Sequence, residues 1–201
     1  MEDFYQTIEK ESQGFFKDKG SKFYSFAYPV KNEDEVKEIL ARLRKEHHSA
    51  RHHCYAWRLG TEEITFRAND DGEPSSTAGK PILGQLQSFN VTNTLIVVVR
   101  YFGGILLGVS GLINAYRNAA AAALKNAEIK QKTVNREIIL DFTYNEFAEV
   151  MNMIKHENLA VIYTRLEERC NLAFSVRKSE IDKVTAVFRK IYGVSVMNKT
   201  S

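Results

Sequence analysis

Apolar residues recur along the chain at two spacings, and the spacing predicts where helices and strands lie. Val36, Ile39, Leu40 and Leu43 recur at helical spacing after Asn32, a residue type that caps helix N-termini, so we expect a helix from about 32 to 47. The same periodicity predicts helices over 80–89 and 112–128. Short aromatic or β-branched runs predict strands over 23–30 and 90–100 and a hairpin built from 53–59 and 64–67.

The second part of the chain has a different order of predicted elements. We expect strands and helices in the order βαββαβ, over residues 137–144, 145–156, 160–166, 170–176, 179–191 and 194–197. This order in about 65 residues is typical of the ferredoxin-like split βαβ arrangement. We therefore predict an α+β protein of two domains, residues 1–132 and 135–201, joined by the polar stretch Lys130–Asn135.

Composition narrows the class of protein. The 201 residues are 44% hydrophobic and include only three prolines, so the chain is expected to fold. Its longest apolar run, Leu95–Val99, is too short to span a bilayer, and residues 1–4 lack the basic and apolar regions of a signal peptide. We therefore expect a soluble, cytoplasmic protein without a membrane partner. Cys54 and Cys170 form no CxxC pair, which excludes a disulfide framework and a cysteine-rich zinc module.

Charge is distributed unevenly along the first domain. The net charge of +3 is too small to indicate nucleic acid by itself. Residues 42–58 are nevertheless basic and hold four of the five histidines, whereas residues 62–73 are acidic. Two solvated faces would explain such runs as well as a binding surface would.

A glycine-rich connection follows the strand that contains Leu95–Val99. Its glycines are Gly103, Gly104, Gly108 and Gly111. Glycines permit close approach of the backbone to a ligand, and a following helix N-terminus favours an anion, so a phosphate site is physically reasonable. The spacing matches neither the Walker A nor the Rossmann motif. The alternative is that the glycines serve a tight connection and close helix–sheet packing.

A polar loop between residues 69 and 81 is the second candidate. It concentrates acids, hydroxyls and turn formers, which suit acid–base chemistry, cation binding or hydroxyl activation. The bidentate acid that an EF-hand needs at its twelfth position is absent, and the Asp-Gly and Glu-Pro pairs are equally consistent with two tight turns.

Histidines beside Cys54 raise the question of a metal site. On a strand, His52 and Cys54 would point to one face and His53 to the other, so one metal ion could not gather all three easily. We expect no metal and no cofactor, and we interpret Cys54 as a small core residue. The sequence also suggests no histidine or thiol beside the acids of the polar loop, and hence no nucleophile–base pair there.

Three motifs in the first domain resemble the IMPACT/YigZ family. They are Ala50-x-His52-x-Cys54-Tyr55-Ala56, the segment from Asp70-Asp71-Gly72-Glu73-Pro74-Ser75 to Thr77-Ala78-Gly79-Lys80-Pro81, and Arg100-Tyr101-Phe102-Gly103-Gly104. The resemblance implies an N-terminal α/β domain similar to the ribosomal-protein fold shared with GHMP kinases and elongation factor G. It implies a tail similar to the last domain of that factor. Eukaryotic members are linked to translational control under amino-acid starvation, through competition for an activator of an initiation-factor kinase.

The chain departs from this family pattern at four positions. Leu106 stands where the glycine-rich loop usually has lysine, and Asn114 stands where arginine is frequent. Ser76 and His53 occupy positions often held by Gly and Asn. Two missing cations weaken a phosphate-binding interpretation, because phosphate contacts act through charge neutralisation. Backbone N–H groups, Lys80, Arg100 and Arg117 would then have to bind the anion.

We expect a non-enzymatic binding protein that acts on the translation apparatus, with RNA, a protein or a phosphorylated small molecule as possible ligands. The alternative is a small-molecule hydrolase or transferase that holds an anion at the glycine-rich loop and uses Asp70, Asp71 or Glu73 as a base. The candidate binding residues are His52, Cys54, Asp70, Asp71, Gly72, Glu73, Pro74, Ser75, Ser76, Gly79, Lys80, Arg100, Tyr101, Phe102, Gly103, Gly104, Gly108 and Gly111. We expect the two loops that carry most of them to face each other across one groove.

Overall fold

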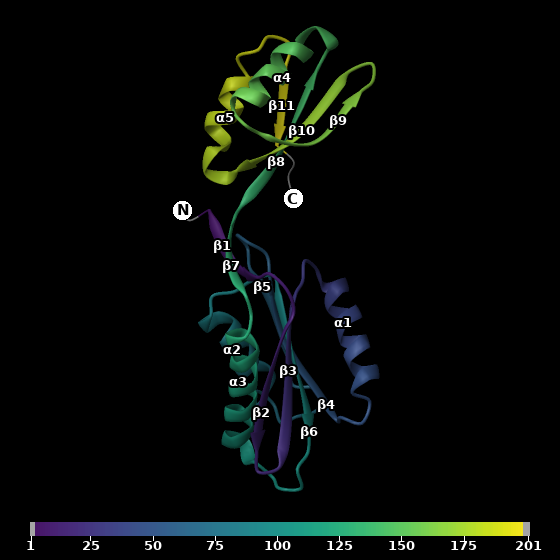
Figure 1. Cartoon of the computed structure of the whole chain (residues 1–201), viewed down its shortest axis with the longest axis vertical. Coiled ribbons are helices and arrows are strands. Elements are labelled where there is room, and N and C mark those ends of the chain that lie inside the picture. The colour runs from purple at the N-terminus through teal and green to yellow at the C-terminus, as the bar shows by residue number, and fades with distance from the viewer. Residues whose placement is uncertain (1–2, 199–201) are drawn as a thin grey trace. The chain divides into compact units, whose positions relative to one another are not determined.

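The computed structural model describes residues 3–198, which form two compact units (Figure 1). Residues 5–132 make up the first unit. Residues 133–198, together with Asp3 and Phe4, make up the second. Among the described residues, no helix is both long and apolar enough to cross a membrane.

The first unit contains a five-stranded antiparallel sheet with helices on both faces. The strands lie in the order β2-β3-β6-β4-β5, and every neighbouring pair is antiparallel. Helix α1 covers one face and helices α2 and α3 cover the other (Figure 1). A separate two-stranded sheet pairs β1 with β7. The elements are β1 (Phe4–Ile8), β2 (Ser12–Asp18), β3 (Ser21–Pro29), α1 (Glu33–Glu46), β4 (His52–Leu59), β5 (Thr65–Asn69), α2 (Gly79–Ser88), β6 (Thr94–Tyr101), α3 (Gly108–Lys125) and β7 (Ile129–Thr133).

Local sequence explains why α1 begins where it does. The side chain of Asn32 accepts hydrogen bonds from the backbone N–H groups of Asp34 and Glu35, at 3.0 and 2.9 Å. Three acids in the first turn and two cations in the last suit the helix dipole. Val36 and Leu43 are buried against the sheet. The helix predicted over 32–47 is therefore confirmed.

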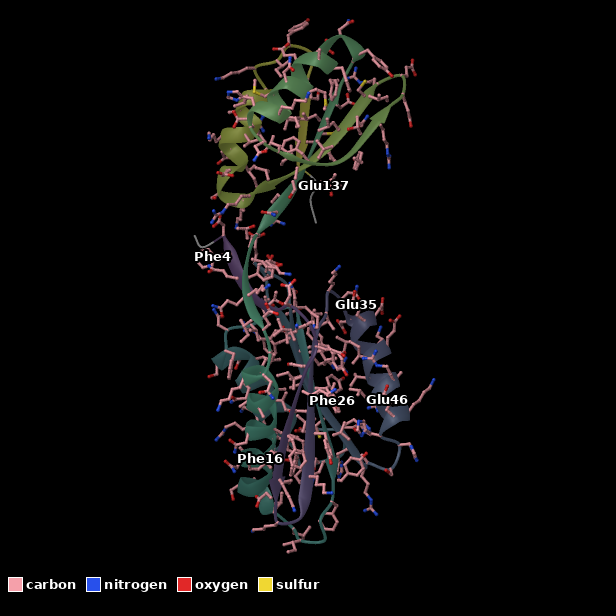
Figure 2. The ribbon with its side chains drawn as sticks, in the orientation of Figure 1. Phe4, Phe16, Phe26, Glu35, Glu46 and Glu137 are labelled. Atoms are coloured by element: carbon pink, nitrogen blue, oxygen red, sulfur yellow. The ribbon has the colours of Figure 1, made fainter. Side chains whose placement is uncertain are left out.

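Two hydrophobic cores lie on opposite faces of the sheet. Phe26 belongs to the core under α1, whereas Phe16 packs against the core under α2 and α3 (Figure 2). The alanines of α3 allow close approach: a Cβ atom at Gly14 of β2 would lie only 2.4 Å from the backbone nitrogen of Ala123. Because helices cover both faces, the central strand β6 is buried on both sides, as predicted for Leu95–Val99.

Three sequence expectations need correction in this unit. Strands β1 and β2 were not predicted, because half-exposed strands at a sheet edge have a weak hydrophobic pattern. Helix α3 begins at Gly108, one turn before the predicted Leu112. The polar connection predicted over Lys130–Asn135 is mostly strand: β7 spans Ile129–Thr133, and Val134 alone separates it from β8.

The second unit is a four-stranded sheet with two helices. Its strands lie in the order β11-β8-β10-β9, all antiparallel, which is the ferredoxin-like βαββαβ topology. Val150 and Ile154 of α4 and Val184 and Phe188 of α5 pack into one core with the sheet. The elements are β8 (Asn135–Phe142), a 3₁₀ turn (Tyr144–Glu146), α4 (Phe147–His156), β9 (Ala160–Leu166), β10 (Cys170–Arg177), a 3₁₀ turn (Lys178–Glu180), α5 (Ile181–Phe188) and β11 (Ser195–Asn198). The chain is thus an α+β protein, as predicted.

Candidate functional site

Asp70 organises the polar loop by binding backbone groups. Its Oδ1 accepts hydrogen bonds from the N–H groups of Ala78 and Gly79, at 3.0 and 2.8 Å, and its Oδ2 accepts one from Ser76 at 2.9 Å. Ala78 cannot cap α2 with its own side chain, so the Asp70 carboxylate satisfies the free N–H groups at the start of that helix. Its negative charge also suits the positive end of the helix dipole.

Asp71 ties the same loop to β4 and α1. Its Oδ2 accepts a 2.7 Å hydrogen bond from the backbone N–H of His53, and its Oδ1 pairs with Nη2 of Arg44 at 3.0 Å. The backbone carbonyl oxygen of Asp71 lies 2.9 Å from Nδ1 of His52. Asp71 has a φ of +41° and Gly72 one of +86°, so the chain turns sharply here. The two acids therefore act as anchors of the loop.

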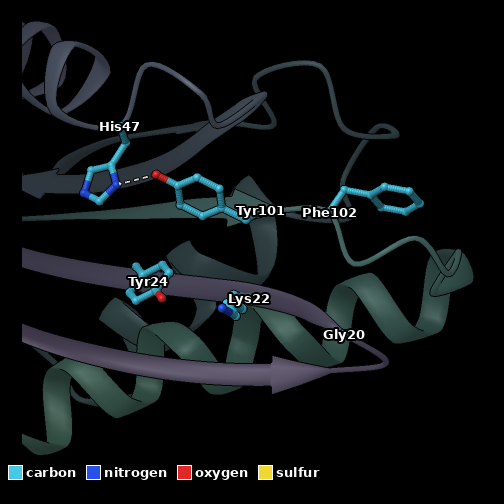
Figure 3. Close-up of a pocket in the computed structure, with 6 residues that line it drawn as sticks. All are labelled: Gly20, Lys22, Tyr24, His47, Tyr101 and Phe102. Atoms are coloured by element: carbon cyan, nitrogen blue, oxygen red, sulfur yellow. Dashed lines mark hydrogen bonds between the residues drawn. The ribbon is translucent and has the colours of Figure 1, made fainter.

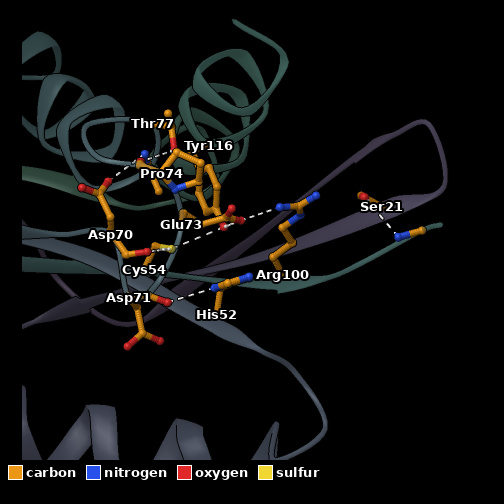
Figure 4. Close-up of polar contacts among 12 residues, drawn as sticks. Ser21, His52, Cys54, Asp70, Asp71, Glu73, Pro74, Thr77, Arg100 and Tyr116 are labelled. Atoms are coloured by element: carbon orange, nitrogen blue, oxygen red, sulfur yellow. Dashed lines mark hydrogen bonds and ion pairs between the residues drawn. The ribbon is translucent and has the colours of Figure 1, made fainter. Parts of the chain in front are cut away.

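Glu73 forms the polar centre of the site. Its Oε1 lies 2.6 Å from Nη1 of Arg100 and accepts a 2.7 Å hydrogen bond from the hydroxyl of Tyr116 (Figure 4). The side chains of Glu73 and Arg100 are only 4% and 7% exposed. The Arg100 guanidinium also lies over the rings of Phe23 and Phe102, at 5.6 and 5.7 Å. Arg100 is thus already paired with a carboxylate, and its predicted role in holding an anion stays a prediction.

Cys54 lies against this centre, where it contacts a backbone carbonyl and a hydroxyl group. Its Sγ is 3.0 Å from the carbonyl oxygen of Asp70 and 3.3 Å from the hydroxyl of Tyr116. Burial raises the pKa of the Cys54 thiol and that of the Tyr116 hydroxyl far above their ordinary values, so both groups stay protonated near neutral pH. Cys54 belongs to the core under α2 and α3, as its interpretation as a small core residue predicted.

The glycines of the glycine-rich loop have two different structural roles. A Cβ atom at Gly103 would lie 2.1 Å from the backbone nitrogen of Ser21, so this glycine permits close packing of two chain segments. Gly104 and Gly108 have φ values of +87° and +72°, and a Cβ atom at either would meet open space, so they are needed for backbone conformation. No side chain caps the N-terminus of α3, which begins at Gly108.

The two loops meet at one pocket of about 430 Å³. Glu73 and Pro74 come from the polar loop, and Leu106, Leu107, Gly108 and Val109 come from the glycine-rich loop. We call this cavity the loop pocket. His52, Arg51, Arg100, Phe102 and Leu112 complete its lining.

Only part of the predicted site lines the loop pocket. His52, Glu73, Pro74, Arg100, Phe102 and Gly108 do so, and Tyr101 lines a neighbouring cleft. The other candidate residues are not among its lining residues; they are Cys54, Asp70, Asp71, Gly72, Ser75, Ser76, Gly79, Lys80, Gly103, Gly104 and Gly111. The sequence did not single out Arg51, which belongs to the basic stretch 42–58, or Leu107, Val109 and Leu112, because apolar residues close to glycines are usually packing residues. Across residues 3–198, no cluster of three or more His, Cys, Asp or Glu could hold a metal ion.

Comparison with known proteins identifies the first unit. The sequence profile described as the Impact N-terminal domain matches residues 19–124, which include both loops and every strand of the large sheet except β2. The chain belongs to the IMPACT family. It is 33% identical over 188 residues to the IMPACT family member YvyE of Bacillus subtilis. The alignment covers 88% of this chain and 86% of that protein.

Two further matches extend over most of the chain. An IMPACT family member of Haemophilus influenzae is 32% identical over 166 residues, or 82% of this chain and 81% of the relative. A crystal structure described as that of a hypothetical protein superposes with a TM-score of 0.76 at 26% identity and covers all of both chains. The likeness to IMPACT family members therefore includes the second unit as well as the first.

Proposed function

We propose that this member of the IMPACT family is a non-enzymatic binding protein that acts on the translation apparatus through the loop pocket. One observation carries the choice of binding over catalysis: each acid of the polar loop already holds a structural partner. Asp70 binds three backbone N–H groups, Asp71 binds His53 and Arg44, and Glu73 binds Arg100 and Tyr116. These bonds hold the three carboxylates in place within the fold, which suits a structural role for them better than proton transfer to a ligand.

The protonated state of the neighbouring groups supports the same proposal. A thiol becomes a nucleophile only as its thiolate, and burial raises the pKa of Cys54 so that it stays in the neutral form. Tyr116 likewise stays neutral, and its hydroxyl donates a hydrogen bond to Glu73. The site therefore has a fixed, preorganised set of hydrogen bonds, which suits recognition of a partner.

The residues at the rim of the loop pocket suggest that the component of the translation apparatus that binds there is a protein. Leu106, Val109 and Phe102 are 82%, 60% and 54% exposed, and Ile105 beside them is also exposed. Leu106 stands where the family usually has lysine, so this rim offers apolar contact in place of a positive charge. Clustered apolar side chains at a surface are typical of protein–protein contacts. The link to translation is carried over from the eukaryotic members of the family.

Co-sedimentation with purified ribosomes tests this proposal. We expect the wild-type chain to sediment with ribosomes, and Leu106→Glu combined with Val109→Glu to reduce the bound fraction by about tenfold, because charges would have to be desolvated at the contact. Phe66→Glu is the matched control, since Phe66 is 59% exposed on β5 of the same sheet. Equal binding by the loop variant and the wild type, or no binding by either, would contradict the proposal.

A small-molecule enzyme remains the second candidate, favoured by the size of the loop pocket. A cavity of about 430 Å³ lies in the range of small-ligand sites. The test is a metabolite mixture incubated with the protein and analysed by mass spectrometry. We expect no compound to be consumed. Reproducible consumption of one compound by the wild type, lost in Glu73→Gln, would replace the binding proposal with an enzymatic one.

A further inference from the structure

A second, open cleft of about 550 Å³ lies on the α1 face of the large sheet (Figure 3). Gly20, Lys22, Tyr24, His47, Tyr101 and Phe102 line it. Phe102 is the one residue that it shares with the loop pocket, so the two cavities are neighbours with different linings. We call it the aromatic cleft.

Four rings form a continuous series beside this cleft. The ring of Phe15 lies 5.0 Å from that of Tyr24, which in turn lies 5.8 Å from Tyr101 and 6.3 Å from His47. Nδ1 of His47 and the hydroxyl of Tyr101 are joined by a 2.8 Å hydrogen bond, which holds both rings in place (Figure 3). Phe15 is 49% exposed, so its ring presents much of its surface to solvent.

Packing of the fold does not account for this exposure. Helix α1 covers the part of the sheet that holds Tyr55, Trp57 and Val97, whereas alternate residues of β2 on the same face stay exposed. Those residues are Gln13, Phe15 and Lys17. An apolar ring left on an uncovered sheet face contributes little to the core, and it is available to stack with a ligand.

Two lysines lie at one end of the Phe15–Tyr24 pair of rings. Lys17 of β2 and Lys22 of β3 are directly opposite each other in the antiparallel pair, and both are exposed. Like charges at directly opposite positions destabilise a sheet. An anion bound between them would remove the repulsion. No acid is among the residues that line the aromatic cleft.

We propose that the aromatic cleft, together with Phe15 and Lys17 beside it, binds single-stranded RNA. Bases would stack on the rings of Phe15 and Tyr24, and the ammonium groups of Lys17 and Lys22 would neutralise the phosphates between those bases. Rings that accept bases next to cations that follow the backbone are the usual means of binding single strands. An acidic protein partner would use the lysines but would leave the row of rings unexplained. The choice of RNA over DNA rests on the proposed role in translation. The inference that a single strand binds here does not, because it is argued from the rings and lysines alone.

Fluorescence anisotropy with labelled oligonucleotides tests the inference on the full-length chain. The probes are a single-stranded RNA of about ten nucleotides, the DNA of the same sequence and the RNA duplex, because single-strand sites span about 4–16 nucleotides. We expect the RNA strand to bind more tightly than the duplex. We expect Phe15→Ala to weaken its binding about tenfold through lost stacking. Phe66→Ala, which removes another exposed ring, this one from β5, should bind as the wild type does.

A salt series separates the lysines from the rings. For single strands the slope of log K against log salt changes by about 0.7 per phosphate contact, so Lys22→Ala should lower the slope by about that amount. Phe15→Ala should leave it unchanged. Lys125→Ala is the control for charge, since Lys125 ends α3 on the other face of the sheet. The emission of Trp57, which is buried in this unit, verifies that each variant is folded.

The outcomes distinguish this inference from the proposed function. No binding of the RNA strand at low salt, or equal binding by Phe15→Ala and the wild type, would overturn the inference even if ribosomes still sediment the protein through Leu106. RNA binding that depends on Phe15 and Lys22 would support the inference even if no ribosome is bound. Tighter binding of the DNA strand than of the RNA strand would overturn the choice of RNA.

Discussion

The hydroxyl of Tyr116 donates a hydrogen bond to Oε1 of Glu73, the same oxygen that the Arg100 guanidinium contacts. Tyr116 lies on α3, 43 positions beyond Glu73, and its side chain is fully buried. The loop that carries Glu73 is thereby held by groups from a helix and from the central strand. A buried carboxylate with two donors is a stable arrangement only while both partners remain.

Removing either side of this arrangement should destabilise the first unit by different amounts. We expect Glu73→Ala to lower the free energy of unfolding by about 3–5 kcal/mol, because Arg100 is left as a buried charge without its partner. Tyr116→Phe should cost about 1–3 kcal/mol, because Glu73 keeps Arg100. Urea unfolding followed by the fluorescence of Trp57, the single tryptophan of the chain, measures both.

The surface variant Phe66→Ala is the control for this pair of substitutions and should unfold much as the wild type does. Equal losses for Glu73→Ala and Tyr116→Phe would contradict a dominant ion pair between Glu73 and Arg100.

The Asp70 carboxylate should control the order of the polar loop. We expect Asp70→Ala to cost about 1–2 kcal/mol of stability, as loss of a helix N-cap does, and to speed amide exchange in residues 76–79. Asp70→Asn keeps one acceptor oxygen and should give a smaller effect. Hydrogen exchange with mass spectrometry provides the measurement. Exchange in residues 76–79 that is unchanged in Asp70→Ala would show that other contacts order the loop.

Stability of the first unit should fall in acid partly because of His53. Burial lowers the pKa of this imidazole below 6.5, against the opposing charge of Asp71, and its Nε2 has no hydrogen-bond partner among the described residues. The unfolded chain therefore binds the proton first. The neutral form contributes stability above pH 6.5, and this contribution decreases as the pH falls through 6.5 toward the folded pKa.

The variant His53→Asn isolates this effect, because it removes one titrating group and leaves the other four histidines in place. Unfolding by urea, followed through Trp57 at a series of pH values, should give a shallower loss of stability below pH 6.5 for the variant than for the wild type. Identical pH profiles would show that His53 does not titrate differently in the folded and unfolded chains.

The domain division remains a prediction, and the structure refines how to test it. Asp3 forms a bidentate pair with Arg177, at 2.6 and 2.8 Å, and its carbonyl oxygen accepts a 2.7 Å hydrogen bond from Val134. The hydrogen bonds from Arg177 hold the pKa of Asp3 well below its ordinary range. The Asp3–Arg177 pair therefore contributes to stability at neutral pH, and this contribution is lost in strong acid. We expect residues 1–132 expressed alone to show the Trp57 emission of the full chain.

The fragment 135–201 lacks Asp3, so its β8 strand should exchange amide hydrogens faster than β8 of the full chain. Asp3→Asn in the full chain should move exchange in the same direction. A fragment 1–132 with the emission of unfolded tryptophan would contradict two separately folding domains.

Local sequence determined most elements of both units. The Asn32 cap with Val36 and Leu43, the βαββαβ order after residue 134 and the apolar run Leu95–Val99 each predicted what the structure contains. These features depend on side chains within a few positions of one another, and hydrophobic periodicity reports such neighbours directly. The motifs that resemble the IMPACT family also identified both loops.

Tertiary structure alone decided what the site residues do. The pairing of His52 with Arg100 in the β4–β6 register brings the polar loop, Cys54 and Arg100 together, although Glu73 and Arg100 lie 27 positions apart. The hydrophobic pattern likewise did not predict the edge strand β2, which carries Phe15 and Lys17. Partners separated by tens of residues are chosen by strand register and by the packing of α3 on the sheet. No local spacing encodes those long-range contacts, which is why the acids read as free groups in the sequence and are bonded anchors in the fold.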